Sequence, residues 1–396
     1  MQILYVIIAL VCSACIAFTM TPIARVLAFK IGAVDVPKDT RRMHRVAMPL
    51  LGGVAIFTAF VVTVLAFCDL QENWKVILGL LGGATVIVIT GILDDRFSLN
   101  PFLKLFLQIL AAAIVAFSGI TIDQIGGYWL KDILPDTTFL GIPVYNFVNI
   151  PLTIVWIAAV TNAINLIDGL DGLSCGVSTI SAISILISSF FMPDVPTIAI
   201  LLTAILAGSC LGFLPYNFNP AKIFMGDTGA MFLGFTLSTI SVIGVFKTDA
   251  IIAYWVPFIA FAVPLCDTAF AFIRRILQGK SPFAADRGHI HHKLIDMGFN
   301  QRQSVTILYA ISAIFGIASV LWAINRPIGG IVVIVCAIVI LFTNWRFITK
   351  NDTTRQETSL GLGHLIPEKT KGTDEAAAST RSDVANAQQA ENNENN

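Results

Sequence analysis

The sequence predicts an all-α protein that crosses a membrane in about eleven helices, with its N-terminus outside and its C-terminus in the cytoplasm. Of its 396 residues, 56% are hydrophobic and only 13% are charged, whereas about a quarter of the residues in a soluble domain are charged. Apolar runs long enough to span a bilayer recur along most of the chain. The basic residues gather in alternate connecting segments, and this asymmetry sets the orientation.

The predicted spans lie at 3–23, 50–67, 75–93, 102–118, 150–167, 174–191, 196–215, 229–246, 250–272, 305–324 and 328–348. Together they form one membrane domain, residues 1–350. Within it, 119–149 is polar and broken by Gly126 and Gly127, so we expect an external loop with room for a hairpin. Residues 351–396 have too little apolar content to fold alone, and we predict a disordered cytoplasmic tail.

The orientation follows from lysine and arginine. The segments 25–50 and 273–304 are both rich in basic residues, and we place both in the cytoplasm. Alternation then leaves outside only Lys75, Lys131, Lys247 and Arg326 of the 25 basic residues. The formal net charge is zero and no basic block alternates with aromatic residues, so we expect no nucleic-acid partner.

Two adjacent acids, Asp94 and Asp95, follow the third predicted span. Adjacent carboxylates repel each other unless a cation or a shared proton relieves them. Asn100 and Pro101 then predict a cap and first turn for the next helix. Two solvated loop acids would give the same pattern, and this motif alone does not separate the two interpretations.

A regular polar series closes the fifth predicted span. Asn162, Asn165, Asp168 and Asp171 are spaced by three, which brings them onto one side of a helix or a tight turn. Gly169 removes side-chain bulk, so that a phosphate or nucleoside can approach the backbone. Because carboxylates within a membrane are costly and usually functional, we interpret these four polar residues as site residues.

Asp227 precedes the eighth predicted span and is flanked by Gly226 and Gly229 within Met225–Gly229. One interpretation makes it a helix N-cap. The other makes it a carboxylate that bridges to a phosphate through a metal, since a helix N-terminus favours phosphate. Upstream, Asn217 could hydrogen-bond a base or sugar, and Phe224 could stack on one.

Two basic segments complete the candidate set. The first is Arg287–Lys293, with His289, His291 and His292, where no nearby cysteine or acidic set completes a zinc site, so diphosphate binding fits better. The second is the first cytoplasmic loop, with Asp35, Arg41, Arg42 and His44. This loop could dock the phosphate of a lipid, or it could serve only as the signal for orientation.

The topology brings these motifs together. An orientation based on Lys and Arg places all of the acids and the histidine segment on one side of the membrane. Acids at several helix ends beside a basic loop resemble a magnesium-dependent phosphoryl-transfer site at the bilayer surface. A cation-coupled transporter is the rival class, but it would concentrate its acids near the membrane midplane.

These segments, in this order, resemble the polyprenyl-phosphate N-acetylhexosamine-1-phosphate transferases, relatives of phospho-MurNAc-pentapeptide translocase, over residues 1–350. The resemblance implies transfer of a sugar 1-phosphate from a cytoplasmic UDP-sugar to undecaprenyl phosphate in the inner (cytoplasmic) membrane, with UMP released. It implies a requirement for Mg²⁺, with Mn²⁺ as a substitute. Asp227 would be the metal ligand, with Asp168 as a second one.

The resemblance also assigns roles within the site. Asp94 would deprotonate or hold the lipid phosphate, with Asp95 supporting the local charge, and which acid is the base stays open. Asp168, Gly169, Asn217 and Phe224 match positions that contact uridine in the cell-wall relative. The three histidines match its histidine loop near the diphosphate.

The departures from the family pattern indicate the donor. The cell-wall translocase has three consecutive histidines where this chain has His289-Ile290-His291-His292. The first cytoplasmic loop resembles the GlcNAc-1-phosphate branch, so UDP-GlcNAc is the expected donor, with another UDP-N-acetylhexosamine as the alternative. The downstream glycan, such as lipopolysaccharide or teichoic acid, stays open. A homodimer stays open too, since an apolar outer surface contacts lipid and protein equally well.

Overall fold

The computed structural model describes residues 3–36, 47–125, 128–134, 137–139, 142–192, 194–244, 255–279 and 288–324, with a few helical positions between 328 and 335. The predicted tail and nearly all of the eleventh predicted span lie outside these residues. Helices dominate the described chain, as predicted. The long helices are α1 (Ile3–Ile31), α2 (Gly52–Phe67), α3 (Trp74–Phe97), α4 (Pro101–Phe117), α6 (Asn146–Leu166), α7 (Leu173–Phe191), α8 (Thr197–Asn217), α9 (Gly226–Gly244) and α13 (Gln301–Ile324).

Short elements connect the long helices. They are the strand pairs β1 (Val34–Asp35) with β2 (Met48–Pro49), β3 (Gln124–Ile125) with β4 (Tyr128–Trp129) and β5 (Thr138–Phe139) with β6 (Ile142–Pro143), and the helices α5 (Leu130–Ile133), α10 (Trp255–Ala260), α11 (Ala262–Leu277) and α12 (Ile290–Asp296). The segment predicted as a loop with a hairpin therefore holds two hairpins and a single helical turn.

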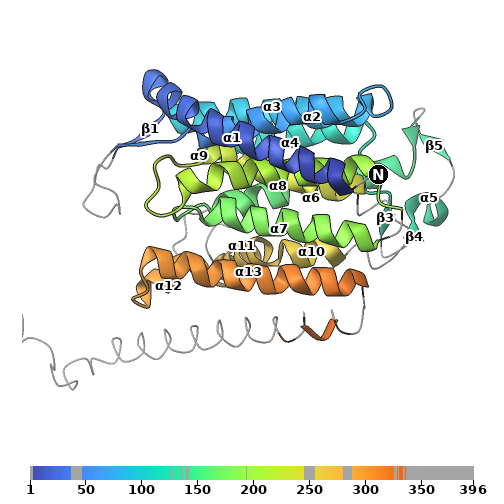
Figure 1. Cartoon of the computed structure of the whole chain (residues 1–396). Helices are drawn as coiled ribbons and strands as arrows, with labels where there is room; N and C mark the ends of the chain where they lie inside the picture. Colours follow the sequence, from blue (N-terminus) through green and yellow to red (C-terminus); the bar gives the residue numbers. More distant parts are fainter. Residues whose placement is uncertain are drawn as a thin grey trace, which may run out of the picture. The chain divides into compact units, whose positions relative to one another are not determined.

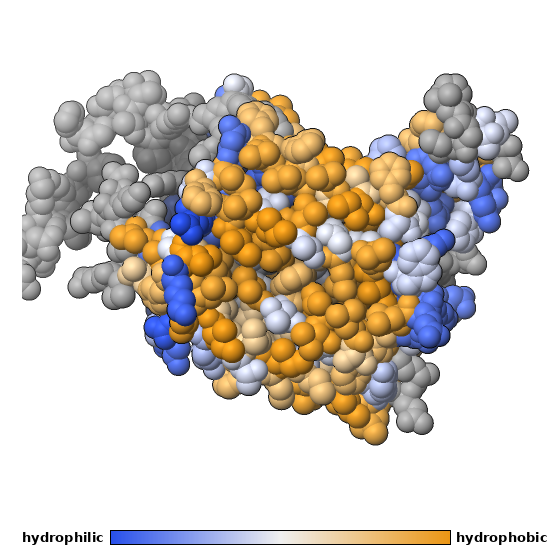
Figure 2. Space-filling view, turned by 90° about the horizontal axis from the view of Figure 1, so that it is seen from above, coloured by the Kyte–Doolittle hydropathy of each residue, from blue (hydrophilic) through white to orange (hydrophobic). Residues whose placement is uncertain are grey.

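The strand pairs, α5 and α12 lie at the two ends of the bundle, whereas α10 and α11 lie within it beside α13 (Figure 1). We name one the α12 end, where β1 and α12 lie, and the other the hairpin end, where the N-terminus, α5 and β3–β5 lie. Among the described residues, seven helices are long and apolar enough to cross a membrane, by length and composition, and α2 and α4 are shorter apolar helices. A broad apolar surface lies between two polar ends (Figure 2). The fold is therefore that of a polytopic membrane protein.

Helix α9 lies at the centre of the bundle, and 94% of the residues in its most apolar stretch are buried. It packs against α2, α3, α6 and α8. Glycines let the neighbouring backbones approach its N-terminus: a Cβ on Gly53 would lie 2.2 Å from the Gly229 nitrogen, and a Cβ on Gly91 would lie 2.3 Å from the Thr228 Cα. Small residues at such crossings are how membrane helices pack closely, and here they fix the start of α9 against α2 and α3.

The predicted span at 250–272 is instead broken into α10 and α11, with its first residues outside the described chain. Pro264 has no N–H to donate to the Ala260 carbonyl, so the helical hydrogen bond between these two residues is missing. The Ser181 hydroxyl on α7 donates to that carbonyl at 2.7 Å instead. Satisfying a freed carbonyl from a neighbouring helix is what allows a break at membrane depth.

Candidate active site

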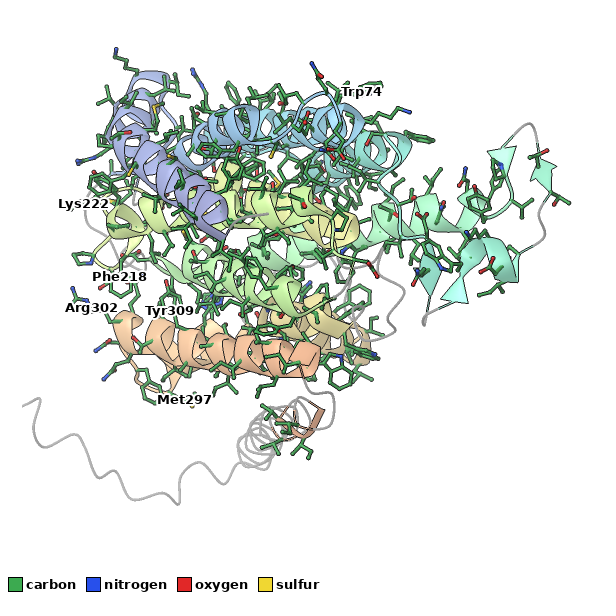
Figure 3. The ribbon with its side chains drawn as sticks, turned by 45° about the vertical axis from the view of Figure 1, so that its right-hand side comes forward. Trp74, Phe218, Lys222, Met297, Arg302 and Tyr309 are labelled. Atoms are coloured by element: carbon green, nitrogen blue, oxygen red, sulfur yellow. The ribbon has the colours of Figure 1, made fainter. Side chains whose placement is uncertain are left out.

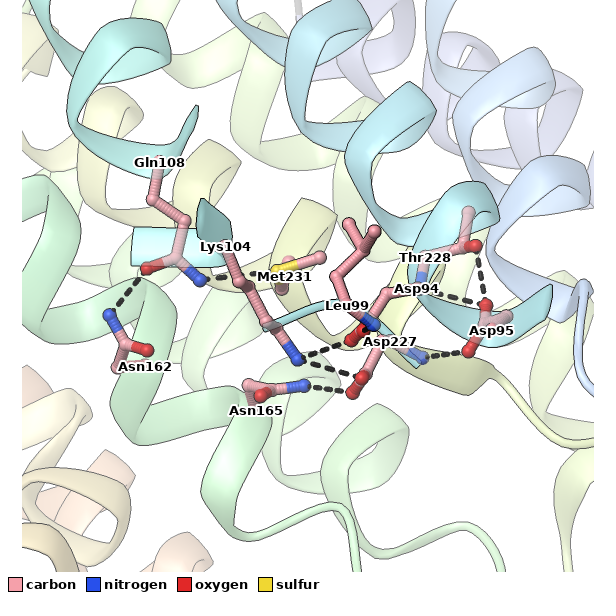
Figure 4. Close-up of polar contacts among 10 residues, drawn as sticks. All are labelled: Asp94, Asp95, Leu99, Lys104, Gln108, Asn162, Asn165, Asp227, Thr228 and Met231. Atoms are coloured by element: carbon pink, nitrogen blue, oxygen red, sulfur yellow. Dashed lines mark hydrogen bonds and ion pairs between the residues drawn. The ribbon is translucent and has the colours of Figure 1, made fainter. Parts of the chain in front are cut away.

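Lys104 lies between two carboxylates at the α12 end of the bundle (Figure 4). Its Nζ is 2.8 Å from Asp94 Oδ2, at the end of α3, and 2.7 Å from Asp227 Oδ2, in the first turn of α9. The other oxygen of Asp94 accepts a hydrogen bond from the Leu99 N–H at 2.7 Å. Two consecutive helices, α3 and α4, and the distant helix α9 thus bring two acids onto a single ammonium group.

The end of α6 supplies two amides to the same region. Asn165 Nδ2 donates to Asp227 Oδ1 at 2.6 Å, so both oxygens of Asp227 are engaged. One turn earlier, Asn162 Nδ2 donates to Gln108 Oε1 at 2.6 Å. Gln108 in turn lies with its Nε2 3.1 Å from Met231 Sδ on α9. Asn165 therefore touches the acid cluster directly, and Asn162 ties α6 to α4 behind it.

Asp95 caps α9 from a different helix. Its carboxylate accepts from the Asp227 N–H at 2.8 Å, the Thr228 N–H at 3.1 Å and the Thr228 hydroxyl at 2.6 Å. These are N–H groups that a helix N-terminus leaves without a partner inside the helix. The interpretation of Asp227 as the N-cap is therefore wrong, because Asp95 fills that role and leaves the Asp227 carboxylate for Lys104 and Asn165.

Asp168 follows α6 in the turn 167–172, and its carboxylate has no hydrogen-bond partner among the residues that the structure describes. Burial raises its pKa well above the usual range, and the nearby carboxylates of Asp227, Asp95 and Asp171 raise it further. The described cluster thus sets several carboxylates against the one ammonium of Lys104. A divalent cation would relieve this excess of negative charge.

The Asp171 carboxylate makes its hydrogen bonds outside this cluster. Its Oδ2 accepts from Asn219 Nδ2 and from the Ala221 N–H, each at 3.0 Å. Asn219 also receives a hydrogen bond from Arg302 Nε at 3.0 Å. The carboxylate thereby anchors the loop between α8 and α9, and its assignment as a site residue, in a catalytic role, stays a prediction.

Asn217 ends α8, and Phe224 lies in the loop between α8 and α9. Asn217 is buried and donates to the Ile223 carbonyl at 3.1 Å. The Phe224 backbone bonds to Pro49 and Gly52, which holds the loop against the start of α2. Phe218, Lys222, Arg302 and Tyr309 lie at the same end of the molecule (Figure 3). Contact of Asn217 and Phe224 with a nucleoside stays a prediction.

The histidine segment packs against the turn that carries Asp168. His289 and His291 are buried, and their rings stack with centroids 5.9 Å apart at 9°. The His291 and His292 centroids are 4.2 Å apart. A Cβ on Gly169 would lie 2.3 Å from His291 Nε2. Burial, and next the neighbouring His292, lower the pKa of His291 to about 4, so this ring is neutral at pH 7.

Gly169→Ala is expected to lower turnover about tenfold or more, because the added methyl group cannot coexist with the His291 ring in its present place. The measurement is the steady-state rate of the purified protein. Gly82→Ala is the matched control, since its Cβ would meet only Ile114 Cγ2 at 3.6 Å, an ordinary contact. Equal rates for the two variants would remove Gly169 from the site.

The donor set fits magnesium. Within the described residues no group of three His, Cys, Asp or Glu side chains has metal-binding geometry. Mg²⁺, however, is usually held by one or two carboxylates together with substrate phosphates and water. Asp227 and Asp168 supply carboxylate oxygens of this kind. Among the described residues, the Asp168 carboxylate has no hydrogen-bond partner.

Four of the predicted site residues in the two basic segments lie outside the described residues. They are Arg41, Arg42, His44 and Arg287, and their assignment to substrate binding stays a prediction. Asp35 lies in β1, opposite Met48 of β2, at the α12 end.

Lys104 and Gln108 were not among the site residues predicted from the sequence. Both stand on α4, where each interrupts an otherwise apolar stretch. A charged or amide side chain in an apolar helix usually faces the bundle interior and marks a functional site. That signal was present in the sequence, but it could not tell which carboxylates Lys104 would bind.

The fold and site define a membrane-embedded enzyme with acids at helix ends, and comparison with known proteins agrees. The profile of glycosyl transferase family 4 matches residues 77–245. A Bacillus subtilis protein named "Probable undecaprenyl-phosphate N-acetylglucosaminyl 1-phosphate transferase" is 39% identical over 80% of this chain and 84% of its own. The Thermotoga maritima "Undecaprenyl-phosphate alpha-N-acetylglucosaminyl 1-phosphate transferase" is 31% identical over 77% and 87%.

A Mycolicibacterium smegmatis "Decaprenyl-phosphate N-acetylglucosaminephosphotransferase" is 31% identical over 83% of this chain and 86% of its own. The chain therefore belongs to the polyprenyl-phosphate N-acetylhexosamine-1-phosphate transferases of glycosyl transferase family 4, in the N-acetylglucosamine branch. The resemblance inferred from the motifs is confirmed, and the protein is a multi-pass membrane protein.

Proposed function

We propose that this protein transfers GlcNAc-1-phosphate from UDP-GlcNAc to undecaprenyl phosphate, giving undecaprenyl-diphosphate-GlcNAc and UMP. The names of its relatives support N-acetylglucosaminyl 1-phosphate as the transferred group and a prenyl phosphate as the acceptor. The observation that carries the proposal is the meeting of Asp94, Lys104 and Asp227 at one end of a membrane bundle. We place this end at the cytoplasmic face of the inner membrane, with the N-terminus outside.

The reaction is a displacement at phosphorus. An oxygen of the lipid phosphate attacks the β-phosphorus of the UDP-sugar, and the bond from that phosphorus to the oxygen bridging to the α-phosphorus breaks, so UMP leaves with that oxygen. Such a transfer depends on in-line geometry and charge neutralisation. In this proposal Lys104 supplies a fixed positive charge, and Asp94, whose Oδ2 lies 2.8 Å from it, would take a proton from the lipid phosphate or hold that phosphate for attack.

Asp227 and Asp168 would hold Mg²⁺, which when bound neutralises charge on the diphosphate. Asn165 fixes one oxygen of Asp227, and Asp95 fixes the first turn of α9 that carries it. In this assignment Asp95 acts through the backbone of α9. The turn at Gly169 and the histidine segment form the neighbouring wall, where we place the diphosphate.

Magnesium is expected to raise the thermal unfolding temperature of the wild-type protein and to have little effect on Asp168→Asn. The asparagine variant is also expected to be the more stable of the two without metal, because Asp168 has no partner for its charge there. The measurement is the unfolding temperature in detergent with and without millimolar MgCl₂. An equal magnesium response in both proteins would contradict the role of Asp168 as a ligand.

Donor choice is tested by transfer of labelled sugar phosphate to undecaprenyl phosphate. The purified protein is given UDP-GlcNAc, UDP-GalNAc or UDP-MurNAc-pentapeptide in parallel. Labelled lipid from UDP-GlcNAc in clear excess is the expected result. Preference for another donor would keep the reaction and overturn the proposed substrate.

A further inference from the structure

Asp267 on α11 forms a buried pair with His289. Asp267 Oδ2 lies 2.8 Å from His289 Nδ1, and the two side chains are only 5% and 6% exposed. The other oxygen, Oδ1, accepts from the Ile290 N–H at 2.9 Å. The carboxylate therefore bonds both to the backbone at the start of α12 and to the imidazole ring of His289.

This pairing determines where His289 carries its proton. A carboxylate oxygen can only accept, so the neighbouring Nδ1 must be the protonated ring nitrogen. Nε2 is then the ring nitrogen left to face a ligand, and a carboxylate on Nδ1 fixes the tautomer and the orientation of the ring. As an imidazolium, His289 presents a positively charged N–H from Nε2, which is a strong donor to a phosphate oxygen.

The pair is joined to the site through its neighbours. The His289 ring stacks on His291, and His291 rests against Gly169, next to Asp168. From α11, Arg274 donates from Nη1 to the Gly288 carbonyl at 3.1 Å, which fixes the residue before His289. Within the described structure, Asp267 and His291 contact the His289 ring, while His292 contacts His291 and Arg274 holds the preceding residue.

We propose that Asp267 is a positioning residue, which fixes the proton of His289 on Nδ1 and directs Nε2 toward the diphosphate of the substrate. The proposal rests on the function proposed above. In Asp267→Asn, the amide can satisfy both neighbours only by accepting from Ile290 and donating to His289 Nδ1. The proton of the imidazole must then move to Nε2, and the carboxylate charge beside Nδ1 is lost.

The first test reads the proton directly and needs no turnover. The chain has five histidines, so imidazole ¹⁵N NMR of histidine-labelled protein at pH 8 is resolvable, with His289→Gln identifying the His289 signals. A protonated Nδ1 in the wild type and an unprotonated Nδ1 in Asp267→Asn are expected. An unprotonated Nδ1 in the wild type overturns the proposal, whether or not the asparagine variant folds well. The same protonation state of Nδ1 in both folded proteins overturns it too.

The second test separates positioning from structural support. Asp267→Asn is expected to lower kcat for UMP release about tenfold to a hundredfold, with a smaller change in KM. In a His289→Gln background the same substitution is expected to change kcat by less than about twofold. Additive effects, or an equal loss in the control Asp296→Asn on the exposed end of α12, would overturn the proposal. Absence of UMP from the wild type would instead reject the proposed function and leave the NMR result to decide the pairing.

Discussion

Asp227→Asn is expected to lower kcat by about a thousandfold or more, although the protein still folds. The substitution keeps the shape of the side chain and one oxygen that can accept from Asn165. It removes the negative charge that faces Lys104 and supplies the proposed magnesium ligand. Loss of a preorganised charge at a phosphoryl-transfer centre costs rate at the chemical step.

The matched control is Asp132→Asn, which makes the same chemical change on exposed α5 at the hairpin end. UMP release is measured for both variants at saturating substrates, together with their unfolding temperatures. Normal rates are expected for the control. An Asp227→Asn rate within tenfold of wild type would remove Asp227 from the reaction.

Lys104→Met is expected to lower turnover about a hundredfold or more and to lower the unfolding temperature. Methionine fills a similar volume but leaves the Asp94 and Asp227 carboxylates facing each other without a cation between them. Breaking a buried ion pair by removing one partner typically costs about 3–5 kcal/mol. The Lys104 and Asp94 side chains are 16% and 8% exposed, so water compensates only in part.

A double variant separates the two effects of Lys104. Lys104→Met with Asp94→Asn removes the unpaired charge and is expected to regain part of the lost unfolding temperature but none of the activity. Lys75→Met, on an exposed lysine at the start of α3, is the control and should match wild type in both measurements. Recovered activity in the double variant would mean that Lys104 serves stability alone.

Most of the bundle could be predicted because long apolar runs have few alternatives to membrane helices. The run at 250–272 was predicted as one helix because it is apolar except for Asp267 and a few small polar positions, and the break at Pro264 depends on a neighbour. Ser181 on α7 satisfies the carbonyl that the proline frees, and no local pattern reveals such a partner. Asn100 was predicted correctly as a cap, since its bond to the Phe102 N–H is local.

The site residues show the same difference between local contacts and contacts between helices. The spacing of Asn165 and Asp168 correctly predicts that both lie near the acid cluster, because a helix end and the turn after it are local geometry. The same spacing fails for Asp171, which turns to the loop at Asn219. The capping of α9 by Asp95 and the pairing of Asp267 with His289 are contacts between helices. Such partners follow from tertiary packing and could not be predicted from spacing.

UMP release by the purified protein tests the central claim most directly. The protein in detergent is given UDP-GlcNAc with and without undecaprenyl phosphate, each with and without MgCl₂. Release that requires both lipid and magnesium, and that is lost in Asp227→Asn, is the predicted result. Folded wild-type protein that releases no UMP, or that releases it equally without the lipid, would contradict the proposed transfer.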